Sequence, residues 1–562
     1  MLADRLLVNG RIYTMDAERP RASALAIAGE HILAVGDDTA AGGQSGGDLR
    51  DLLIPGGQVL DLGGRCVLPG LTDSHIHFVG YALSRRRLDL NEVPTLDDML
   101  ALVAGRAREM PLAGPRAGRA EEWILGRGWD QERWPEPRFP TAADLDAVAP
   151  AHPVLLTAKS GHASVANSLA LQMAGITAGT PDPPGGRIGR AAAGRPDGML
   201  FEDSAMDLVA DLVPLPGPEE TGQALREAFP SAWRVGLTAI HDMDPPPAFA
   251  AYQWLHARGE LGLRVVKYLP ASALDCALKV GLRAGLGDDW LRVGGIKVYA
   301  DGALGPRTAA MLAPYEGEPH NVGVLTTDAD ALRDLARRAT AGGLPLAVHA
   351  IGDRANRLVL DVLADVVQGS DEGADRRVNR HRIEHVQLLH PDDVDRLAAL
   401  GVVASMQPIH ATQDLAMADR YWGDRCATGY AWRSLLEAGT LLAFGSDCPV
   451  EDLNPFLGIH AAVTRRRTDG APGPEGWYPE QRLTVEEAVH GYTLGAAHAA
   501  GLENRLGSLA PGKADDAPLE WRHPLADLVI LDRDIFTCDP MAIAGTQVVA
   551  TMIGGQIVYG GL

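Results

Sequence analysis

The chain has 562 residues, a net charge of -22 and an isoelectric point of about 5.2. Its 46% hydrophobic and 22% charged residues are ordinary for a globular protein, whereas the acidic balance disfavours nucleic acids and anionic membranes as partners. The five cysteines form no CxxC pair, the N-terminus has no apolar signal region, and no apolar run approaches the roughly 20 residues of a membrane span. We therefore expect a cytoplasmic protein without structural disulfides.

Both ends of the chain consist of short apolar runs separated by glycine-rich turns. Near the N-terminus, "RLLVNGRIYTM" (5–15) places Asn-Gly between two such runs, which predicts a β-hairpin. Near the C-terminus, "ADLVILDRD" (526–534) and "VVATMIGGQIVYGGL" (548–562) have the same character. Residues 1–65 and 506–562 are therefore expected to assemble into one composite β-sandwich domain.

The middle of the chain, residues 66–505, alternates short apolar runs with helical patterns, which is typical of βαβ units and a parallel sheet. Helix candidates such as 328–343 and 390–401 begin with acidic residues. The candidate strands are "CVLPGLTD" (66–73), "LTAIHDM" (237–243), "LRVVKYL" (263–269), "GGIKVYADG" (294–302), "LPLAVHAIGD" (344–353), "HRIEHV" (381–386), "VVASMQP" (402–408) and "LLAFGSD" (441–447). Eight strand–helix repeats predict an α/β fold, a (β/α)8 TIM barrel.

One long segment, about 81–232, interrupts the alternation after the first barrel strand and predicts an inserted subdomain. Insertions of this size after a barrel strand commonly cover the active site. The segment contains Trp123, Trp129 and Trp134. These rings would either line an apolar substrate pocket or form the core of the insertion itself, and the second interpretation is favoured.

Two histidines close the first candidate strand. His75 and His77 are two positions apart, so at a strand end both side chains point to the same side, toward the mouth where barrel active sites are built. His349, His385 and Asp447 also fall at predicted strand ends. A core histidine or a capping aspartate would explain any one of them, but their joint placement predicts a divalent metal centre.

Lys297 lies in another candidate strand. An ammonium has no lone pair and cannot bind a metal ion, whereas the carbamate formed from a lysine amine and CO₂ is an anion that can bridge two cations. The alternative is a lysine that pairs with Asp301 or reaches solvent, and local sequence does not separate the two.

A set of motifs in this chain resembles the amidohydrolase superfamily, and within it amidohydrolase family 3, the YtcJ-like metal-dependent hydrolases that include N-substituted formamide deformylases. The motifs are "SHIH" (74–77), "KVYADGALGPRTA" (297–309), "AVHAIGD" (347–353), "RIEH" (382–385) and "FGSDCPV" (444–450). The similarity covers nearly the whole chain, but the closing "PGK…ADLVILD" pattern is interrupted by an insert at 514–525 that contains His523. We expect this insert to be a surface loop.

The resemblance implies a ligand set for one or two divalent cations: His75, His77, Lys297, His349, His385 and Asp447. The first two histidines and the aspartate would hold the more buried ion, the other two histidines the second, and a CO₂-derived carbamate on Lys297 would bridge them. Zn²⁺ is the first expectation, although Mn, Fe, Co or Ni also suit these ligands.

The resemblance also implies the reaction. It is hydrolysis of a non-peptide carbon–nitrogen amide bond in a small molecule, such as an N-substituted formamide or an N-acyl amine, by metal-activated hydroxide with Asp447 as the proton shuttle. Polar residues near the strand ends are candidates for substrate binding: His162, Asp301, Arg307, Gln407 and His410. His241 also ends a strand, but the resemblance gives it no metal role. A homodimer is the expected assembly on base rates.

Two alternatives stay open. Deaminases on the same barrel also use HxH, two later histidines and an aspartate, but they generally need a glutamate shortly after the strand-five histidine, and His349 is followed by "AIGDRAN". A barrel protein without catalysis would typically have lost metal ligands, whereas all six candidate positions are intact here.

Overall fold

The computed structural model describes residues 2–38, 49–91, 93–110, 123–131, 134–158, 163–183, 186–192, 194–201, 203–305, 307–369, 380–511 and 524–561. The chain forms two compact units. One consists of Met1–Gly80 with Arg226–Leu562, and the other of Tyr81–Leu225. Among the described helices, none combines the length and apolar character needed to cross a bilayer.

The centre of the first unit is an eight-stranded parallel sheet, so the predicted (β/α)8 barrel is confirmed. Neighbours in the sheet follow chain order. The strands are β8 (Leu71–Ile76), β15 (Leu237–Asp242), β16 (Arg264–Pro270), β17 (Leu291–Tyr299), β18 (Leu346–Ala350), β19 (Arg382–His385), β20 (Val403–Met406) and β21 (Leu442–Phe444). The segment after β21 returns to β8, because Asp447 N donates to His75 O (2.8 Å) and His77 N donates to Cys448 O (2.8 Å).

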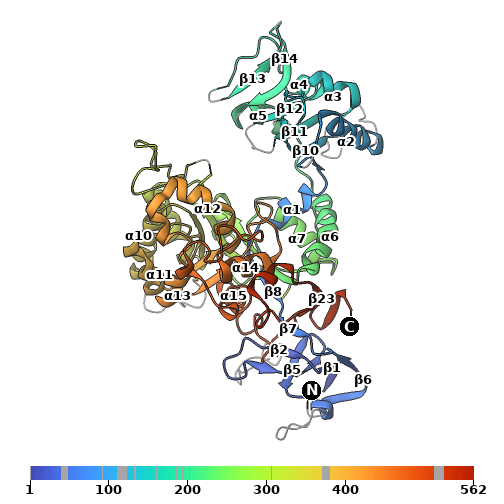
Figure 1. The fold of residues 1–562 in the computed structure, drawn as a ribbon, viewed down its shortest axis with the longest axis vertical. Helices are drawn as coiled ribbons and strands as arrows, with labels where there is room; N and C mark the ends of the chain where they lie inside the picture. Colours follow the sequence, from blue (N-terminus) through green and yellow to red (C-terminus); the bar gives the residue numbers. More distant parts are fainter. Residues whose placement is uncertain are drawn as a thin grey trace. The chain divides into compact units, whose positions relative to one another are not determined.

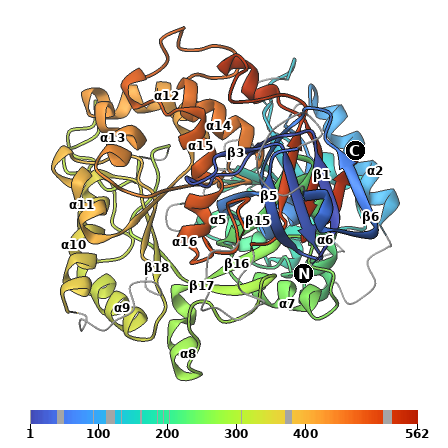
Figure 2. The same cartoon turned by 90° about the horizontal axis from the view of Figure 1, so that it is seen from below.

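Helices lie around the outside of these strands, as α9, α10, α11 and α13 do in Figure 2. The helices of this unit are α7 (Ala248–His256), α8 (Leu274–Lys279), α9 (Ala329–Ala341), α10 (Asp353–Gly369), α11 (Val394–Leu400), α12 (Pro408–Trp422), α13 (Trp432–Glu437), α14 (Pro455–Thr464), α15 (Val485–Gly491) and α16 (Leu494–Ala499). The acidic start predicted at 328 is the N-cap of α9, where the Asp328 side chain accepts from Asp330 N and Ala331 N.

The first candidate strand, 66–73, is two strands in two sheets. β7 (Cys66–Pro69) pairs with β2 (Arg11–Tyr13) and β22 (Leu528–Leu531), outside the barrel, and the barrel strand β8 begins at Leu71. Gly70 separates them. A Cβ on Gly70 would lie 2.3 Å from Thr238 Oγ1, so only glycine allows the chain to pass this close to β15 as it changes sheets.

Strands from both ends of the chain build two further sheets in this unit. One has the order β5-β4-β1-β6 and the other β24-β23-β22-β7-β2-β3. The remaining strands are β1 (Ala3–Val8), β3 (Arg21–Ala22), β4 (Ala24–Ala28), β5 (His31–Gly36), β6 (Leu53–Asp61), β23 (Val548–Ile553) and β24 (Gln556–Gly560). Side chains from both sheets, including Leu25 and Leu528, share one hydrophobic core, which makes this part a β-sandwich. Blue and red strands lie together near the termini in Figure 1.

The hairpin predicted at 5–15 is wrong. β1 pairs with β4 and β6, whereas β2 pairs with β3 and β7, so the Asn-Gly step carries the chain from one sheet to the other. Asn9 does have the positive φ (55°) that the motif favours. A Cβ on Gly10 would lie 2.4 Å from Cδ1 of the core residue Leu62, so a larger residue at this corner would require the Leu62 side chain to move.

The second unit, Tyr81–Leu225, contains a six-stranded sheet in the order β13-β14-β12-β11-β10-β9. Its strands are β9 (Leu88–Asp89), β10 (Ile124–Trp129), β11 (Val154–Ala158), β12 (Ala163–Ala166), β13 (Arg187–Arg190) and β14 (Pro196–Phe201). Its helices are α2 (Leu96–Glu109), α3 (Ala142–Val148), α4 (Ser168–Met173) and α5 (Asp203–Ala210). The helices α1 (Phe78–Ser84) and α6 (Pro218–Arg234) each run across the boundary between the units.

The three tryptophans are buried in the hydrophobic core of this second unit, as the favoured interpretation predicted. Trp129 Nε1 donates to Leu156 O (3.0 Å) and Trp134 Nε1 donates to Val93 O (3.2 Å). Each of these two rings therefore has both its apolar surface and its N–H satisfied within the unit.

Candidate metal centre

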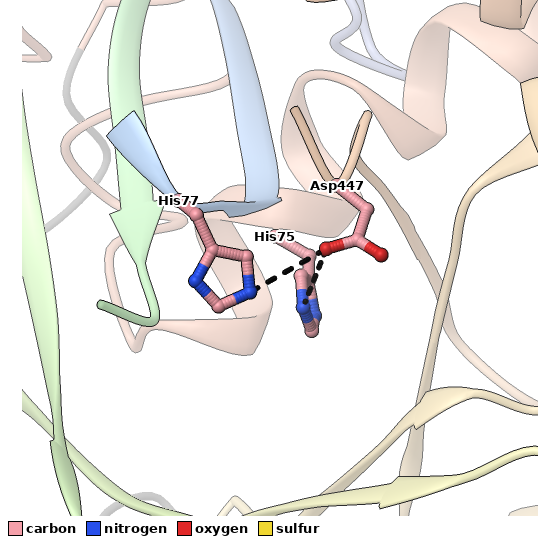
Figure 3. Close-up of side chains that lie close together, drawn as sticks. All are labelled: His75, His77 and Asp447. Atoms are coloured by element: carbon pink, nitrogen blue, oxygen red, sulfur yellow. Dashed lines mark ion pairs between the residues drawn. The ribbon is translucent and has the colours of Figure 1, made fainter. Parts of the chain in front are cut away.

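Three predicted ligands converge at the end of β8. The Nε2 atoms of His75 and His77 lie 3.4 and 3.5 Å from Asp447 Oδ1, and in Figure 3 both rings point toward this carboxylate oxygen. One ligand atom from each of the three residues lies within 4.8 Å of the others. The two-residue spacing on β8 thus brings both imidazoles to the segment that follows β21.

His385 and His349 continue this cluster along the neighbouring strands. The ring of His385, the last residue of β19, is centred 4.8 Å from that of His75 and 4.5 Å from that of His349 on β18. Parallel register explains the proximity, because Ala350, next to His349, pairs with His385. The structure therefore brings together all four histidines that the sequence singled out as ligands.

Hydrogen bonds on the outer side of the rings determine which imidazole nitrogen carries the proton and which has a free lone pair for a metal ion. The Nδ1 atoms of His75, His77 and His385 face oxygen acceptors: Glu384 Oε2 (2.5 Å), Asp244 Oδ1 (3.3 Å) and Gln407 Oε1 (2.7 Å) respectively. An acceptor opposite Nδ1 places the proton of a neutral imidazole on Nδ1. The Nε2 lone pairs of all three rings are then available to a cation.

His349 has the opposite arrangement. Its Nε2 lies 3.0 Å from the carbonyl oxygen of Gly302. A carbonyl only accepts, so the proton of neutral His349 is on Nε2 and the lone pair is on Nδ1. Burial and the charge of Lys297 lower the pKa of His349 to about 3, so the ring is neutral at pH 7 and able to bind a metal ion.

Asp447 lies on a turn and has a positive φ of 59°. Its second oxygen, Oδ2, is 3.4 Å from His410 Nε2, and the other nitrogen of His410 is 3.6 Å from Glu451 Oε1. Burial opposes the charged form of His410, but the two carboxylates raise its pKa to about 10. With both nitrogens facing carboxylates, His410 is positioned as a donor that orients Asp447. Its ligand atoms also lie close enough to those of His385 and Asp447 for the three residues to hold a metal ion. Burial likewise opposes ionisation of Asp447, but His410 and His75 hold its pKa well below the usual value.

Lys297 lies on β17, buried beneath the strand ends. Its Nζ has no hydrogen-bond partner among the described residues, and it sits 4.9 Å from the centre of the Tyr299 ring. Burial lowers the pKa of Lys297 to about 8. An unpaired buried ammonium is costly, and a lowered pKa increases the fraction of neutral amine, the form that reacts with CO₂.

The residues present fit a divalent cation. Imidazole nitrogens with free lone pairs, an ionised carboxylate and a buried lysine with no hydrogen-bond partner among the described residues converge on one mouth of the barrel. They are a suitable donor set for Zn²⁺ and similar ions. Each ligand-bearing ring has an acceptor on its outer nitrogen, as in established metal sites.

The residues predicted to bind substrate are more scattered. Gln407 is buried and its Oε1 faces His385 Nδ1 (2.7 Å), so it supports a proposed ligand. Asp301 is also buried, and its carboxylate accepts from Ala310 N (2.8 Å), Ile351 N (3.0 Å) and Gly352 N (2.9 Å). Backbone amides thus engage the Asp301 carboxylate and a histidine engages Gln407 Oε1, and the assignment of both residues to substrate binding stays a prediction.

Two further substrate candidates stay predictions. Arg307 pairs with Glu318 and its guanidinium lies 5.3 Å from the centre of the Tyr421 ring, so no described contact brings it to the centre. His162 lies outside the described residues, as does His523 of the C-terminal insert.

The sequence motifs did not point to the residues that face the outer nitrogens of the proposed ligands. Glu384 adjoins His385 in "RIEH" but faces His75, and Asp244 follows β15 and faces His77. The available signals were the glutamate next to His385 and the acidic residues that follow His241 at the end of β15. His241 accepts from Arg382 Nη1 at Nδ1 (2.9 Å), in keeping with a supporting role.

Tyr299, two residues after Lys297, is 46% exposed and its ring centre is 5.3 Å from that of His349.

A parallel barrel whose strand ends direct histidine nitrogens and an aspartate to one point defines a metal-dependent hydrolase of the barrel type. The chain belongs to the amidohydrolase family, whose model matches residues 58–559. It is therefore a hydrolase that acts on carbon–nitrogen bonds other than peptide bonds.

Known proteins share this organisation over nearly their full length. The chain is 34% identical to the putative amidohydrolase YtcJ of Bacillus subtilis over 90% of this chain and 91% of that protein. It is 29% identical to the N-substituted formamide deformylase of Arthrobacter pascens over 99% and 98%. The crystal structure of an uncharacterized metal-dependent hydrolase from Pyrococcus furiosus superposes with a TM-score of 0.75 at 28% identity, covering 95% of this chain and 100% of that one.

Proposed function

We propose that this protein hydrolyses the amide bond of a small N-substituted formamide or N-acyl amine. The observation that carries the proposal is the convergence of His75, His77 and Asp447, with His385 and His349 beside them, at one mouth of the barrel. The similarity to an N-substituted formamide deformylase over nearly the whole chain supports this substrate class.

The proposed ligands are the Nε2 atoms of His75, His77 and His385, the Nδ1 atom of His349, and Asp447. The buried Lys297, as its carbamate, completes the set and removes an ammonium for which the described part of the chain offers no hydrogen-bond partner. Zn²⁺ is the proposed ion because imidazole and carboxylate ligands suit it. When bound, a divalent cation would lower the pKa of a water molecule toward about 7 and polarise the substrate carbonyl.

Asp447 is the proposed proton shuttle. Its pKa is held well below the ordinary value, so it is ionised at neutral pH and can accept a proton from the attacking water. It then returns this proton to the leaving nitrogen as the carbon–nitrogen bond breaks, and the products are a carboxylic acid and an amine. His410 donates toward Oδ2 (3.4 Å) and so leaves Oδ1 directed at His75 and His77.

The proposal is tested by two measurements on the purified full-length chain. Reconstitution with Zn²⁺ and isotope-labelled bicarbonate, followed by metal analysis, intact-mass measurement and NMR of the labelled carbon, reports stoichiometry and lysine carbamate. A panel of N-alkyl and N-aryl formamides, N-acetyl amines and cyclic amides is then assayed for amine release. Activity on the acyclic amides supports the proposal. Release of ammonia from amino-substituted heterocycles, with no amide hydrolysed, would favour the deaminase, and absence of bound metal would favour a protein without catalysis.

A further inference from the structure

A buried ion pair lies directly behind one of the proposed ligands. Arg382 and Glu384 are both on β19 and both side chains are fully inaccessible. Arg382 Nε donates to Glu384 Oε1 (2.5 Å), and Glu384 Oε2 accepts from His75 Nδ1 (2.5 Å). The carboxylate thus has one oxygen on the guanidinium and the other on the metal-facing imidazole.

Arg382 is itself fixed from several strands. Its guanidinium donates to the carbonyl oxygen of Ser74 on β8 (2.6 Å), to His241 Nδ1 on β15 (2.9 Å) and to the Ser405 hydroxyl on β20, and its Nη1 lies 3.4 Å from the Tyr268 hydroxyl on β16. These contacts join β19 to four other barrel strands. A guanidinium with so many fixed acceptors has little freedom to rotate, and neither has the carboxylate bound to it.

Stability alone does not account for this pair. Removing two charges from water costs several kcal/mol for each ion in typical proteins, and well-packed apolar pairs of similar volume are often as stable or more stable. A buried pair with ideal geometry, one end of which touches a ligand, therefore points to a role in the site.

The neighbouring ligands have weaker versions of the same contact. His77 Nδ1 is 3.3 Å from Asp244, and His385 Nδ1 faces the neutral amide of Gln407 at 2.7 Å. The contact of His75 combines a full negative charge, a short distance and complete burial, a setting in which charge-assisted hydrogen bonds are strongest.

We propose that Glu384 is a positioning residue for His75: it keeps the proton on Nδ1, fixes the ring so that Nε2 faces Asp447, and is itself held in place by Arg382. This inference rests on the proposed metal centre. A carboxylate behind an imidazole raises the basicity of the ligand nitrogen, and loss of such a partner typically lowers metal affinity about 10- to 100-fold.

The test is metal affinity of the full-length protein, measured by competition with a chromogenic chelator for Zn²⁺, together with the visible absorption spectrum of the Co²⁺ form. Glu384→Gln keeps the size of the side chain but removes its charge, and is expected to bind Zn²⁺ roughly 10- to 100-fold more weakly with an altered Co²⁺ spectrum. Because Glu384→Gln leaves the buried charge of Arg382 without a counter-charge, the double variant Arg382→Met/Glu384→Gln is measured beside it. The double variant is expected to regain thermal stability but not metal affinity.

The matched control is a second buried pair in the same unit. Arg264 donates to Asp527 through Nε (2.6 Å) and Nη2 (2.9 Å), and neither residue contacts a proposed ligand. Asp527→Asn should lower the unfolding temperature and leave Zn²⁺ affinity unchanged. Wild-type affinity in both Glu384 variants would overturn the inference while leaving the proposed function intact. Failure of the wild-type protein to bind any divalent cation would overturn both.

Discussion

The replacement Asp447→Asn separates proton transfer from the rest of the centre. Asparagine has nearly the same shape, but one carboxylate oxygen becomes an NH₂ group. His410 faces Oδ2 as a donor and requires an acceptor there, so the amide oxygen of the variant will turn to His410. The NH₂ group is then directed to the position of Oδ1, 3.4 and 3.5 Å from the Nε2 atoms of His75 and His77, and it cannot accept a proton there.

The magnitude follows from the loss of general acid–base catalysis. A positioned acid–base group contributes about 10²- to 10⁴-fold to rate, and with about 1.4 kcal/mol for each factor of ten, kcat/KM should fall by the equivalent of about 2.8 to 5.6 kcal/mol. The four histidines and Lys297 are unchanged, so at saturating Zn²⁺ the variant should retain most of its metal.

The assay combines steady-state amine release from the best formamide or N-acyl substrate with metal analysis of the same sample. We expect a large fall in kcat/KM with metal still bound. A variant that retains near wild-type kcat/KM would remove Asp447 from the role of proton shuttle. A variant that loses its metal entirely would show that Asp447 is needed chiefly as a ligand.

The remaining predictions concern the lysine, the cation and the inserted unit. Lys297→Ala should abolish stoichiometric metal binding. Short carboxylic acids added to the variant should partly restore activity, which is measured as amine release at increasing acid concentration. Normal metal content together with no rescue would exclude Lys297 as a ligand. Removal of the cation by a chelator should lower the unfolding temperature, since a ligand present at 100 times its dissociation constant contributes about 2.7 kcal/mol to stability. Identical melting curves with and without metal would contradict a metal site that forms in the folded protein. Trp129→Ala should destabilise the second unit by about 3 to 5 kcal/mol, measured by denaturant unfolding, while Zn²⁺ affinity stays normal. A loss of Zn²⁺ affinity without destabilisation would contradict the assignment of Trp129 to the hydrophobic core.

The strand ends were predictable because they follow a simple rule. Each proposed ligand except Lys297 comes at or next to the carboxyl end of an apolar run, and in a parallel barrel all such ends meet at one mouth. The positions of His75, His77, His349, His385 and Asp447 therefore followed from strand prediction and a count of eight. The resemblance to a known family added the proposal that Lys297 bridges two cations, a role that spacing alone left open.

Local patterns failed where packing between sheets decides the path of the chain. The Asn-Gly at 9–10 has the backbone conformation of a hairpin turn, yet its two flanking strands belong to different sheets. The run 66–73 reads as one strand, yet Gly70 divides it between the sandwich and the barrel because Thr238 leaves no room for a side chain. Neither neighbour, Leu62 or Thr238, is close in sequence to the glycine it contacts.

By itself, the sequence determined the kind of chemistry, because residue types and their placement at strand ends fix which atoms can bind a cation. The tertiary structure decided how those atoms are held. It places Glu384, on β19, against His75, on β8. It also places His410 between Asp447 and Glu451, so that His410 acts as a hydrogen-bond donor. The physical reason is that proton positions on imidazoles depend on the acceptors around each ring, and these come from parts of the chain that only closure of the barrel brings together.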